Sequence, residues 1–458
     1  MLGRSNPARI WLLALALALA ACGGSSSPQP LEDRSAECPD EEAKDTVFAA
    51  MRSLYLWNDE SALQRRYDTT DLAAFSDERD LLDSLRWRPQ THDRGFTYVT
   101  SPAAEDRQNA GRALSWGFLL AWTGASELRV QEAIEGGPVA AAGVRRGFSL
   151  LAIDGRSVEE IGDAEGIGAA LGYPRLDPGT TRTMRFRDLA GREIERTIAV
   201  AEFDVDPVPI VRVFENGGTR VGYVLLRSFV PPAVAAFEAA IERFRDEGVR
   251  RVIVDLRYNG GGSLPVAEAI AGMLAAPELT GERFYELRFN REQASNDQTG
   301  LFAARYGGRS LAAGEFEEVH FVGTQRSASA SELLINGFRP WRARIGTGLV
   351  GSPTFGKPVG QAAADYCNDY RRLRIVTFRA ENADGFGEFF DGLSPDCPAS
   401  DDLDSALGET REGLLAAALQ LVQEGTCAAP AARAASARRE APRGIDALPL
   451  AGRYDGIL

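Results

Sequence analysis

Lysine is almost absent from this 458-residue chain, in which arginine supplies all but two of the 51 basic residues. The two exceptions are Lys44 and Lys357. Arginine stays protonated in proteins, whereas a buried lysine can lose its proton and become a base. Lys44 lies in a charged, helix-like stretch, and we interpret it as ordinary surface. Lys357 lies in a segment rich in glycine and proline, where it is either a chance survivor or a functional amine.

Histidine and closely paired cysteines are scarce as well. His92 and His320 lie far apart, and neither has an acidic partner at a recognisable motif, so a serine–histidine–aspartate triad is not expected. The lack of any Cys-x-x-Cys pair, together with so few histidines, argues against a zinc site. The acidic cluster near the C-terminal end does not have the spacing of an EF-hand loop. We therefore expect neither a metal nor a cofactor.

An excess of positive charge is also lacking, because the formal net charge is −14. Binding to phosphates needs clustered lysine and arginine, so nucleic acid is not an expected partner. The same charge argues against electrostatic adsorption to an anionic membrane. With 44% apolar and 25% charged residues the chain is typical of globular proteins, and its length allows about two to four domains.

No apolar run is long enough for a comfortable transmembrane helix. The run Ile10–Ala21 follows two arginines, which is the pattern of a signal peptide. It ends in Leu-Ala-Ala before Cys22, which resembles the lipobox of bacterial lipoproteins. This resemblance implies a lipoprotein signal peptide over 1–22, a lipid on Cys22 and a flexible tether over 23–37. The alternative is a plain secretory signal that is cut nearby.

Four further cysteines, Cys38, Cys367, Cys397 and Cys427, make an even number, which in an exported chain is compatible with two disulfides. Four cysteines allow three pairings. We expect Cys367–Cys397 within one domain and Cys38–Cys427 joining the ends of the chain.

The segment 38–105 has the pattern of a helical domain, since Val47, Met51, Leu54 and Tyr55 fall at helical spacing. Nothing in it has the pattern of a catalytic motif. It is therefore predicted to be structural.

The segment 110–205 changes character, because short strand-like runs alternate with glycine- and proline-containing turns. Its small-residue helix, glycine stop and strand ending in Asp154-Gly155 resemble a PDZ domain of the bacterial protease type. The resemblance implies that the domain binds an extended peptide as an added strand and holds its terminal carboxylate with backbone N–H groups. The matching peptide-binding loop is Trp116, Gly117, Phe118 and Leu119. The alternative is a small β domain that only packs.

Residues 206–427 alternate strands with helices, and near-continuous apolar strands such as Val-Ile-Val-Asp-Leu indicate a sheet covered on both faces. The fold class predicted is therefore α/β. The tail 428–458 consists of alanine, arginine and proline without a period and is predicted to be a low-complexity segment.

Two motifs in this region can carry chemistry. Asp255–Ser263 ends a strand and continues through three glycines, a turn whose N–H groups can stabilise an anion. Ser327–Glu332, Ser-Ala-Ser-Ala-Ser-Glu, lies at a strand-to-helix junction where a small-residue environment exposes a serine hydroxyl. Read alone, the first is a tight turn and the second a helix cap.

Lys357 is followed four residues later by Gln361. An amine that acts as a base near neutrality needs a pKa well below its usual value of about 10.4, through burial or a neighbouring positive charge. Gln361 could accept a hydrogen bond from such an amine and orient it.

Together these motifs, in this order, resemble the C-terminal processing peptidases, or tail-specific proteases. The resemblance implies a serine–lysine peptidase on a crotonase-like α/β core, with the PDZ-like β domain and the N-terminal helical domain ahead of it. By motif position the nucleophile is Ser329, the base is Lys357 and its orienting partner is Gln361. The oxyanion hole falls on the N–H groups of Gly261 and Ala330.

The function expected is a serine endopeptidase of the bacterial cell envelope, lipid-anchored and facing the periplasm, with the outer membrane as the expected location. It would cleave proteins or peptides recognised through their C-terminal tails. The alternatives are a non-proteolytic binding lipoprotein on the same fold and a PDZ adaptor. The oligomeric state is not predicted.

Overall fold

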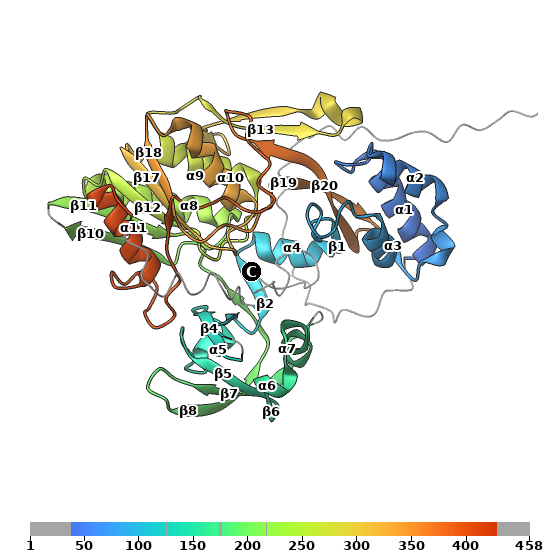
Figure 1. The fold of residues 1–458 in the computed structure, drawn as a ribbon, viewed down its shortest axis with the longest axis horizontal. Coiled ribbons are helices and arrows are strands. Elements are labelled where there is room, and N and C mark those ends of the chain that lie inside the picture. Colours follow the sequence, from blue (N-terminus) through green and yellow to red (C-terminus); the bar gives the residue numbers. More distant parts are fainter. Residues whose placement is uncertain (1–37, 125, 174–175, 217, 428–458) are drawn as a thin grey trace, which may run out of the picture.

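The computed structural model describes residues 38–124, 126–173, 176–216 and 218–427. The predicted signal peptide with Cys22, the tether and the tail 428–458 lie outside these residues. An N-terminal group of helices, a β domain and a larger α/β core are visible as separate bodies in Figure 1.

The core is built on a six-stranded sheet in the order β10-β11-β12-β17-β18-β21. β10 is antiparallel to β11, and the other neighbours are parallel. These strands are β10 (Ile210–Asn216), β11 (Thr219–Leu225), β12 (Arg251–Asp255), β17 (Glu318–Gly323), β18 (Gly346–Gly351) and β21 (Cys397–Pro398).

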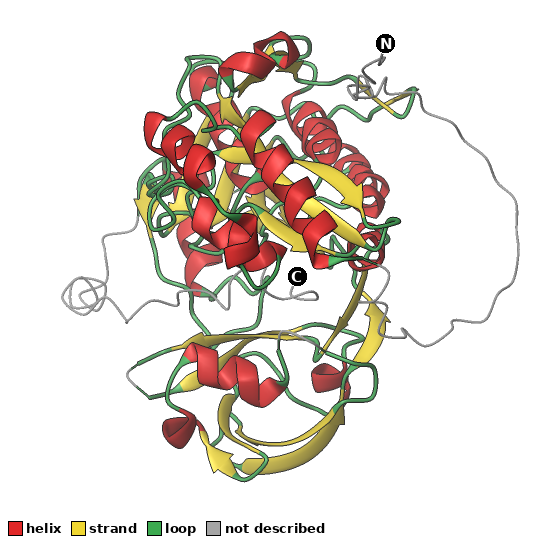
Figure 2. Ribbon diagram, turned by 90° about the vertical axis from the view of Figure 1, so that its right-hand side faces the viewer, coloured by secondary structure: helices red, strands yellow, loops and turns green. Residues whose placement is uncertain are grey.

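Helices cover both faces of this sheet, as Figure 2 shows from the side. In β12, Val252 and Val254 pack with the helices of one face, whereas Ile253 packs with α11 on the other. Burial on both sides explains why the strand is apolar at consecutive positions, and the predicted α/β class is what the structure has. The helices are α8 (Pro231–Asp246), α9 (Leu264–Ala275) and α10 (Ala330–Phe338) on one face and α11 (Gly413–Glu424) on the other. The finer crotonase-like assignment stays a prediction.

A second, antiparallel sheet joins the core to the N-terminal helices. Its order is β1-β20-β13-β14, with β19 also paired to β20. The strands are β1 (Tyr98–Thr100), β13 (Arg283–Phe289), β14 (Gln298–Leu301), β19 (Val359–Tyr366) and β20 (Arg371–Glu381). Shorter elements nearby are η3 (Arg291–Asn296), β15 (Arg305–Tyr306), β16 (Arg309–Ser310) and η4 (Arg339–Trp341).

The N-terminal helices pack on this second sheet through an apolar cluster that includes Val47, Met51 and Tyr55, all fully buried. The segment 38–105 contains three helices, the first part of a fourth and one short 3-10 helix among its described residues, and it also contributes β1 to a sheet of the core. A strand of three residues is too short to show a sequence pattern of its own. The elements are α1 (Asp40–Ser53), α2 (Ser61–Thr69), η2 (Leu72–Ala74), α3 (Glu78–Leu85) and α4 (Pro102–Asn109).

The β domain lies below the core in Figure 1. Its main sheet has the order β3-β4-β5-β7-β8 with β6 beside β5, so β3 is an edge strand among the described residues. A separate pair, β2 and β9, begins and ends the domain. The elements are β2 (Arg112–Ser115), β3 (Phe118–Trp122), β4 (Leu128–Ala133), α5 (Pro138–Ala141), β5 (Ser149–Ile153), β6 (Arg156–Ser157), α6 (Val158–Ile161), α7 (Ala164–Leu171), β7 (Thr181–Arg187), β8 (Glu193–Ala199) and β9 (Ala201–Asp204). The PDZ assignment stays a prediction.

The disulfide pairing differs from the one expected. The structure joins Cys38 to Cys367 and Cys397 to Cys427, so the predicted Cys367–Cys397 and Cys38–Cys427 bonds are wrong. Cys367 lies in the turn between β19 and β20, against which the N-terminal helices pack, and its Cα is 5.1 Å from that of Cys38. Cys427 follows α11, which brings its Cα within 5.2 Å of Cys397 in β21.

Lys44 is not the surface residue that its sequence context indicates. It is 8% exposed, and its Nζ donates a hydrogen bond to the Phe75 carbonyl at 3.0 Å. The charged neighbours of Lys44 in sequence concealed this position because one face of α1 is exposed and the other is buried.

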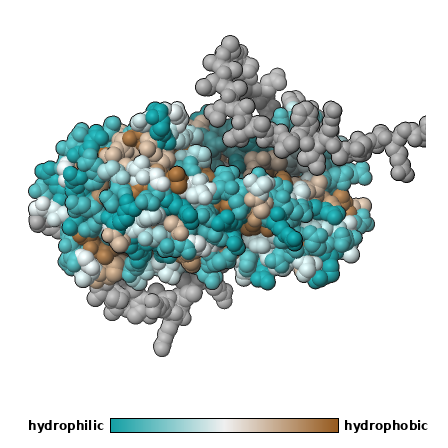
Figure 3. All heavy atoms as spheres, turned by 90° about the horizontal axis from the view of Figure 1, so that it is seen from above, coloured by the Kyte–Doolittle hydropathy of each residue, from teal (hydrophilic) through white to brown (hydrophobic). Residues whose placement is uncertain are grey.

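The outer surface is mainly hydrophilic on the face seen in Figure 3, where the apolar patches are small and scattered. Among the described residues there is no helix with both the length and the apolar character needed to cross a membrane.

Candidate active site

Ser329 lies in a strained turn between β17 and α10. Its backbone has φ 55° and ψ −114°, a region that costs a residue with a side chain about 1–3 kcal/mol. The Ser329 carbonyl accepts a hydrogen bond from the Leu333 N–H at 2.8 Å, and the Ser329 N–H donates to Glu332 Oε2 at 3.0 Å. Strain of this kind persists where the surroundings enforce it, and it concentrates at functional turns.

The two other serines of the motif have structural roles. Ser327 Oγ donates to the Leu256 carbonyl at 2.7 Å, and Ser331 Oγ donates to the Asn259 carbonyl at 2.8 Å. Both side chains are fully buried. Ser329, by contrast, lines a pocket, so of these three hydroxyls it is the one placed to meet a substrate.

The glycine turn between β12 and α9 packs directly on the nucleophile turn. A Cβ atom on Gly261, whose φ is 112°, would lie 2.8 Å from Ser329 Cβ and 3.0 Å from the Ala330 nitrogen. The Ala328 N–H also donates to the Asn259 carbonyl at 3.0 Å. Only glycine allows so close an approach at this backbone angle.

The predicted oxyanion hole is only half available in this structure. The Gly261 N–H donates to Asn259 Oδ1 at 2.9 Å, so it is engaged within its own turn. The hydrogen bonds of the described residues include none from the Ala330 N–H, which lies at the start of α10 where the helix dipole favours negative charge. The roles of both groups stay predictions.

Lys357 lies just before β19, which carries Gln361. The Lys357 amine donates to Gln361 Oε1 at 3.0 Å and lies 5.4 Å from the centre of the Phe96 ring. Within the described part of the chain no hydrogen bond joins the amine to Ser329, although both side chains line the same pocket. Catalytic hydrogen bonds are often long without substrate and shorten in the complex.

The surroundings of the amine favour its neutral form. Burial lowers the pKa of Lys357 from 10.5 to about 8, and Arg374 acts in the same direction. The carboxylates of Asp93 and Glu332 oppose this and favour the ammonium. The amine is therefore poised to exchange a proton near neutral pH.

Glu332 is a site residue that the sequence reasoning missed. Its carboxylate is fully buried and accepts hydrogen bonds from Thr354 Oγ1 at 2.5 Å, the Gly356 N–H at 2.6 Å and the Lys357 N–H at 2.8 Å. With its bond from Ser329, it connects the nucleophile turn to the lysine loop, residues 354–357. Burial raises the pKa of this carboxyl, while the four hydrogen bonds favour its charged form. The signal was present, since Glu332 ends the serine motif.

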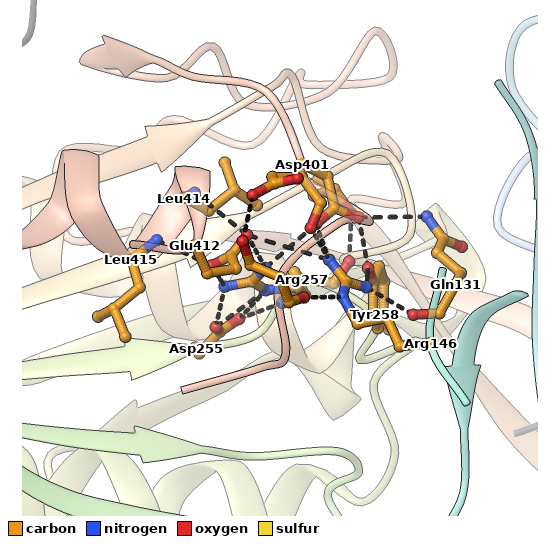
Figure 4. A network of polar contacts seen from close by, with 12 residues as sticks. Gln131, Arg146, Asp255, Arg257, Tyr258, Asp401, Glu412, Leu414 and Leu415 are labelled. Atoms are coloured by element: carbon orange, nitrogen blue, oxygen red, sulfur yellow. Dashed lines mark hydrogen bonds and ion pairs between the residues drawn. The ribbon is translucent and has the colours of Figure 1, made fainter. Parts of the chain in front are cut away.

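A buried network of charges, seen in Figure 4, supports the start of the glycine turn. Arg257 forms ion pairs with Asp255 and with Glu412, the latter at 2.7 Å, and it lies 3.1 Å from Asp401. Although burial opposes it, Arg146 and Arg257 lower the pKa of Asp401. The network joins the turn to the segment before α11.

Arg146 extends this network into the β domain. It pairs with Asp401 at 2.7 Å, and its Nη1 donates to the Gln131 carbonyl and to the Tyr258 hydroxyl. The sequence reasoning singled out the glycine motif, which includes Tyr258, but not Gln131, Arg146 and Asp401, which lie more than a hundred residues away.

A second contact joins the β domain to the nucleophile turn. Arg326, three residues before Ser329, donates through Nη2 to the Leu120 carbonyl of β3 at 2.7 Å. The predicted peptide-binding loop precedes and begins this strand. Trp116 is 1% exposed and its Nε1 donates to the Leu171 carbonyl, so its side chain belongs to the domain core. Gly117, Phe118 and Leu119 continue into the edge strand.

One pocket of about 510 Å³ gathers the predicted catalytic and oxyanion residues. Its lining mixes apolar side chains with polar and charged ones such as Glu105, Arg227 and Arg374, which suits an extended peptide. Its lining includes Gly261, Ser329, Ala330, Lys357 and Gln361, with Leu264, Leu287, Leu333, Phe378 and Phe389. The described residues contain no group of three or more histidine, cysteine or acidic side chains that could hold a metal ion.

Comparison with known proteins points to one enzyme class. Residues 220–399 match the family model described as peptidase family S41. A chloroplastic C-terminal processing peptidase from Tetradesmus obliquus is 24% identical over 337 residues, which are 69% of this chain and 67% of that protein. A carboxyl-terminal-processing protease from Picosynechococcus is 28% identical over 230 residues, half of each chain.

A further relative, carboxyl-terminal-processing peptidase 3 of Arabidopsis thaliana, is 23% identical over 322 residues, 68% of this chain and 58% of the relative. The matches thus span from half to about two thirds of the curated relatives.

Solved structures agree in fold. A crystal structure from Bacteroides fragilis, assigned to the S41 proteases, has a TM-score of 0.62 at 21% identity and covers 83% of this chain and 97% of its own. The photosystem II D1 C-terminal processing protease has a TM-score of 0.50 at 18% identity and covers 79% and 93%. The predicted enzyme class, a serine-type C-terminal processing peptidase, agrees with the match to peptidase family S41 and with the names of the curated relatives.

Proposed function

We propose that this S41-type protein is a serine endopeptidase in which Ser329 is the nucleophile and Lys357 the general base. The observation that carries the proposal is the single pocket that holds the strained Ser329 turn, the glycine turn and an amine whose pKa lies near 8. A protein that only binds ligands has no need of all three together.

The chemistry follows from these positions. The neutral Lys357 amine removes the Ser329 hydroxyl proton as Oγ attacks the peptide carbonyl carbon, and Gln361 keeps the amine in line. The carbonyl oxygen becomes an oxyanion that accepts hydrogen bonds from the Ala330 N–H and from Gly261, which would exchange its bond to Asn259 for one to the oxyanion. The ammonium then protonates the leaving amine, and an acyl-enzyme remains.

Deacylation uses the same groups. The amine, neutral again, removes a proton from water as the water attacks the ester carbonyl. The second tetrahedral intermediate collapses, Ser329 Oγ leaves with the proton from Lys357, and the new carboxylate is released. No cofactor is needed.

Substrate recognition through C-terminal tails is supported by the β domain. Among the described residues β3 pairs with β4 alone, and an extended peptide can add as a strand at its other edge, where the Leu120 carbonyl already accepts a hydrogen bond from Arg326. Arg326 contacts this strand and lies three residues from Ser329, so a tail bound at β3 would be close to the nucleophile turn.

Attachment to the cell envelope is supported by the lipobox-like sequence around Cys22 and by the two disulfides, which persist in oxidising compartments. Lipid labelling tests it. Cys22→Ala is expected to lose labelling by radioactive palmitate and to leave the membrane fraction. Equal labelling of both proteins would contradict the assignment.

An active-site fluorophosphonate tests the enzymatic proposal. Wild-type protein is expected to be labelled on Ser329, with Ser329→Ala and Lys357→Arg unlabelled. Ser263→Ala is a matched control, since this serine lines the same pocket without a proposed role and should be labelled normally. Absence of label on wild type, or equal label on Ser329→Ala, would favour a binding lipoprotein instead.

A further inference from the structure

The N-terminal helical domain, in which the sequence shows no catalytic motif, forms one wall of the base site. The segment 93–97 leads from this domain into β1 and passes beside the lysine loop. Phe96, fully buried, presents its ring to the Lys357 amine at 5.4 Å, and its carbonyl accepts a hydrogen bond from Gln361 Nε2 at 2.6 Å. The orienting glutamine is therefore itself oriented by the N-terminal domain.

Arg94 holds the lysine loop from the side opposite Glu332. Its Nη2 donates to the Phe355 carbonyl at 2.7 Å and to the Gly356 carbonyl at 2.6 Å. Its guanidinium also lies 4.6 Å from the centre of the Phe355 ring. The Gly356 N–H, meanwhile, donates to Glu332 at 2.6 Å. The peptide groups just before Lys357 are thus bonded on both sides, to the N-terminal domain by their oxygens and to α10 by their nitrogens.

Asp93 places a charge near the amine. It is fully buried, accepts hydrogen bonds from the Tyr55 hydroxyl at 2.7 Å and the Thr97 N–H at 2.9 Å, and favours the ammonium form of Lys357. The charged groups that act on the amine are Asp93 from the N-terminal domain, Glu332 from α10 and Arg374 from β20.

We propose that Arg94 is a positioning residue for the general base, so that the N-terminal domain is part of the active site and not only a cover for the second sheet. The inference rests on the proposed serine–lysine mechanism and adds to it the segment that keeps the lysine loop in place. A purely structural role would explain the stability of the domain but not why both carbonyls before Lys357 receive their hydrogen bonds from this one arginine.

The test measures the rate of fluorophosphonate labelling of Ser329 against pH in the full-length protein. Arg94→Met keeps an apolar stem but removes both donors. Labelling is expected to slow by about ten-fold to a hundred-fold, as for other small misplacements of catalytic groups. The acidic limb of the profile should also move to higher pH, because a loosened loop lets water reach the amine and burial is what lowers its pKa.

Two further variants separate positioning from folding. Arg66→Met is the matched control, because Arg66 also donates to a backbone carbonyl, that of Ser84, but within the N-terminal domain and away from the lysine loop. This variant should leave the labelling rate and the acidic limb of the pH profile unchanged. Asp93→Asn should move the limb to lower pH, because a carboxylate that favours the ammonium is removed. A loss of structure would move the limb the opposite way.

Each outcome of these labelling experiments either supports or overturns the role proposed for Arg94. If the wild-type protein is labelled and Arg94→Met has the same labelling rate and the same acidic limb of its pH profile, this inference alone is overturned. If Arg94→Met does not fold, Asp93→Asn decides, and a limb that stays in place overturns the inference. Wild type without label would overturn the proposed function and this inference with it.

Discussion

At the scale of single residues, the chemistry of the site depends on an amine that protein atoms surround. A lysine in water is almost fully protonated at pH 7, but burial brings the pKa of Lys357 to about 8. Arginine cannot replace it, because a guanidinium does not lose its proton in proteins. The scarcity of lysine in this chain therefore coincides with one position where its chemistry is required by the proposed mechanism.

The first prediction concerns pH. Only the neutral amine can accept the serine proton, and its fraction grows as pH rises through about 8. The rate of acylation should therefore rise about ten-fold per pH unit below this value and level off above it. A profile of kcat/KM from pH 5 to 10 checks this. A rate that is flat from pH 6 to 9 would exclude Lys357 as the base.

The second prediction is that Lys357→Met inactivates the enzyme but stabilises the fold. The folded state binds this proton more weakly than the unfolded state, so it carries a penalty that is complete below pH 8 and disappears as pH rises towards 10.5. Removing the amine should raise the free energy of unfolding at pH 7 by about 3 kcal/mol. Urea unfolding at pH 7 and pH 10 measures it, and an equal gain at both values would contradict the explanation.

The third prediction concerns Glu332. Glu332→Gln keeps the shape but has one acceptor oxygen where four donors converge, and its amide must face some of them. Turnover should fall by about a hundred-fold or more, since both the nucleophile and the lysine loop lose their shared anchor. Initial rates with a tailed protein substrate measure the loss, and circular dichroism confirms that the variant is folded.

At the scale of elements, the glycine turn and the nucleophile turn work as one unit. The Asn259 carbonyl receives hydrogen bonds from Ala328 and Ser331, and Gly261 lies so near Ser329 that a Cβ atom added to it would be 2.8 Å from Ser329 Cβ. The turn after β12 and the turn after β17 therefore keep a fixed spacing, which is set by the direct parallel pairing of β12 with β17.

The fourth prediction tests this contact with neighbouring glycines. In Gly261→Ala the new methyl group would collide with Ser329 and the Ala330 nitrogen, at a φ that alanine avoids. In Gly260→Ala it would meet nothing within 4 Å. Labelling by fluorophosphonate should be lost in the first variant and largely kept in the second. Similar losses in both would mean that the close approach is not what matters.

Motifs that act within a few residues of their own sequence could be predicted, and contacts between distant segments could not. The order of Asp255–Ser263, Ser327–Glu332 and Lys357 predicted a shared site, and the structure places these segments around one pocket. Parallel strands bring the residues that follow them to one edge of a sheet, which makes such a grouping readable from sequence. The side chains that support the site depend on packing instead.

The misses share that physical cause. Arg94 and Glu412 reach the site only because the N-terminal helices and α11 pack where they do. The predicted disulfide pairing is wrong for the same reason, since nothing local in the sequence indicates that Cys38 lies against the β19–β20 turn. The predicted surface position of Lys44 is wrong because the charged residues around it in the sequence conceal the buried face of its helix.

At the scale of the whole molecule, the two disulfides restrain different distances along the chain. Cys38–Cys367 joins positions 329 residues apart, whereas Cys397–Cys427 spans 30. The first fastens the N-terminal domain to the hairpin that carries Gln361.

The fifth prediction follows from this difference. Replacing Cys38 and Cys367 by serine should lower stability by about 2–5 kcal/mol and reduce activity, because the N-terminal wall of the base site is loosened. Replacing Cys397 and Cys427 should cost less stability and leave the acidic limb of the pH profile in place. Thermal unfolding and labelling rates of both variants provide the comparison, and a limb shifted equally in both would contradict it.

The pairing of β1 with β20 also determines when during synthesis the site can be completed. A ribosome makes the chain from its N-terminus, so Arg94 and β1 are synthesised long before Ser329, and β20, the partner strand of β1, is synthesised after Lys357. No stretch shorter than most of the chain contains every part of the site. The proposed active site can therefore be complete only after β20, the last of these segments, has been synthesised and has paired with β1.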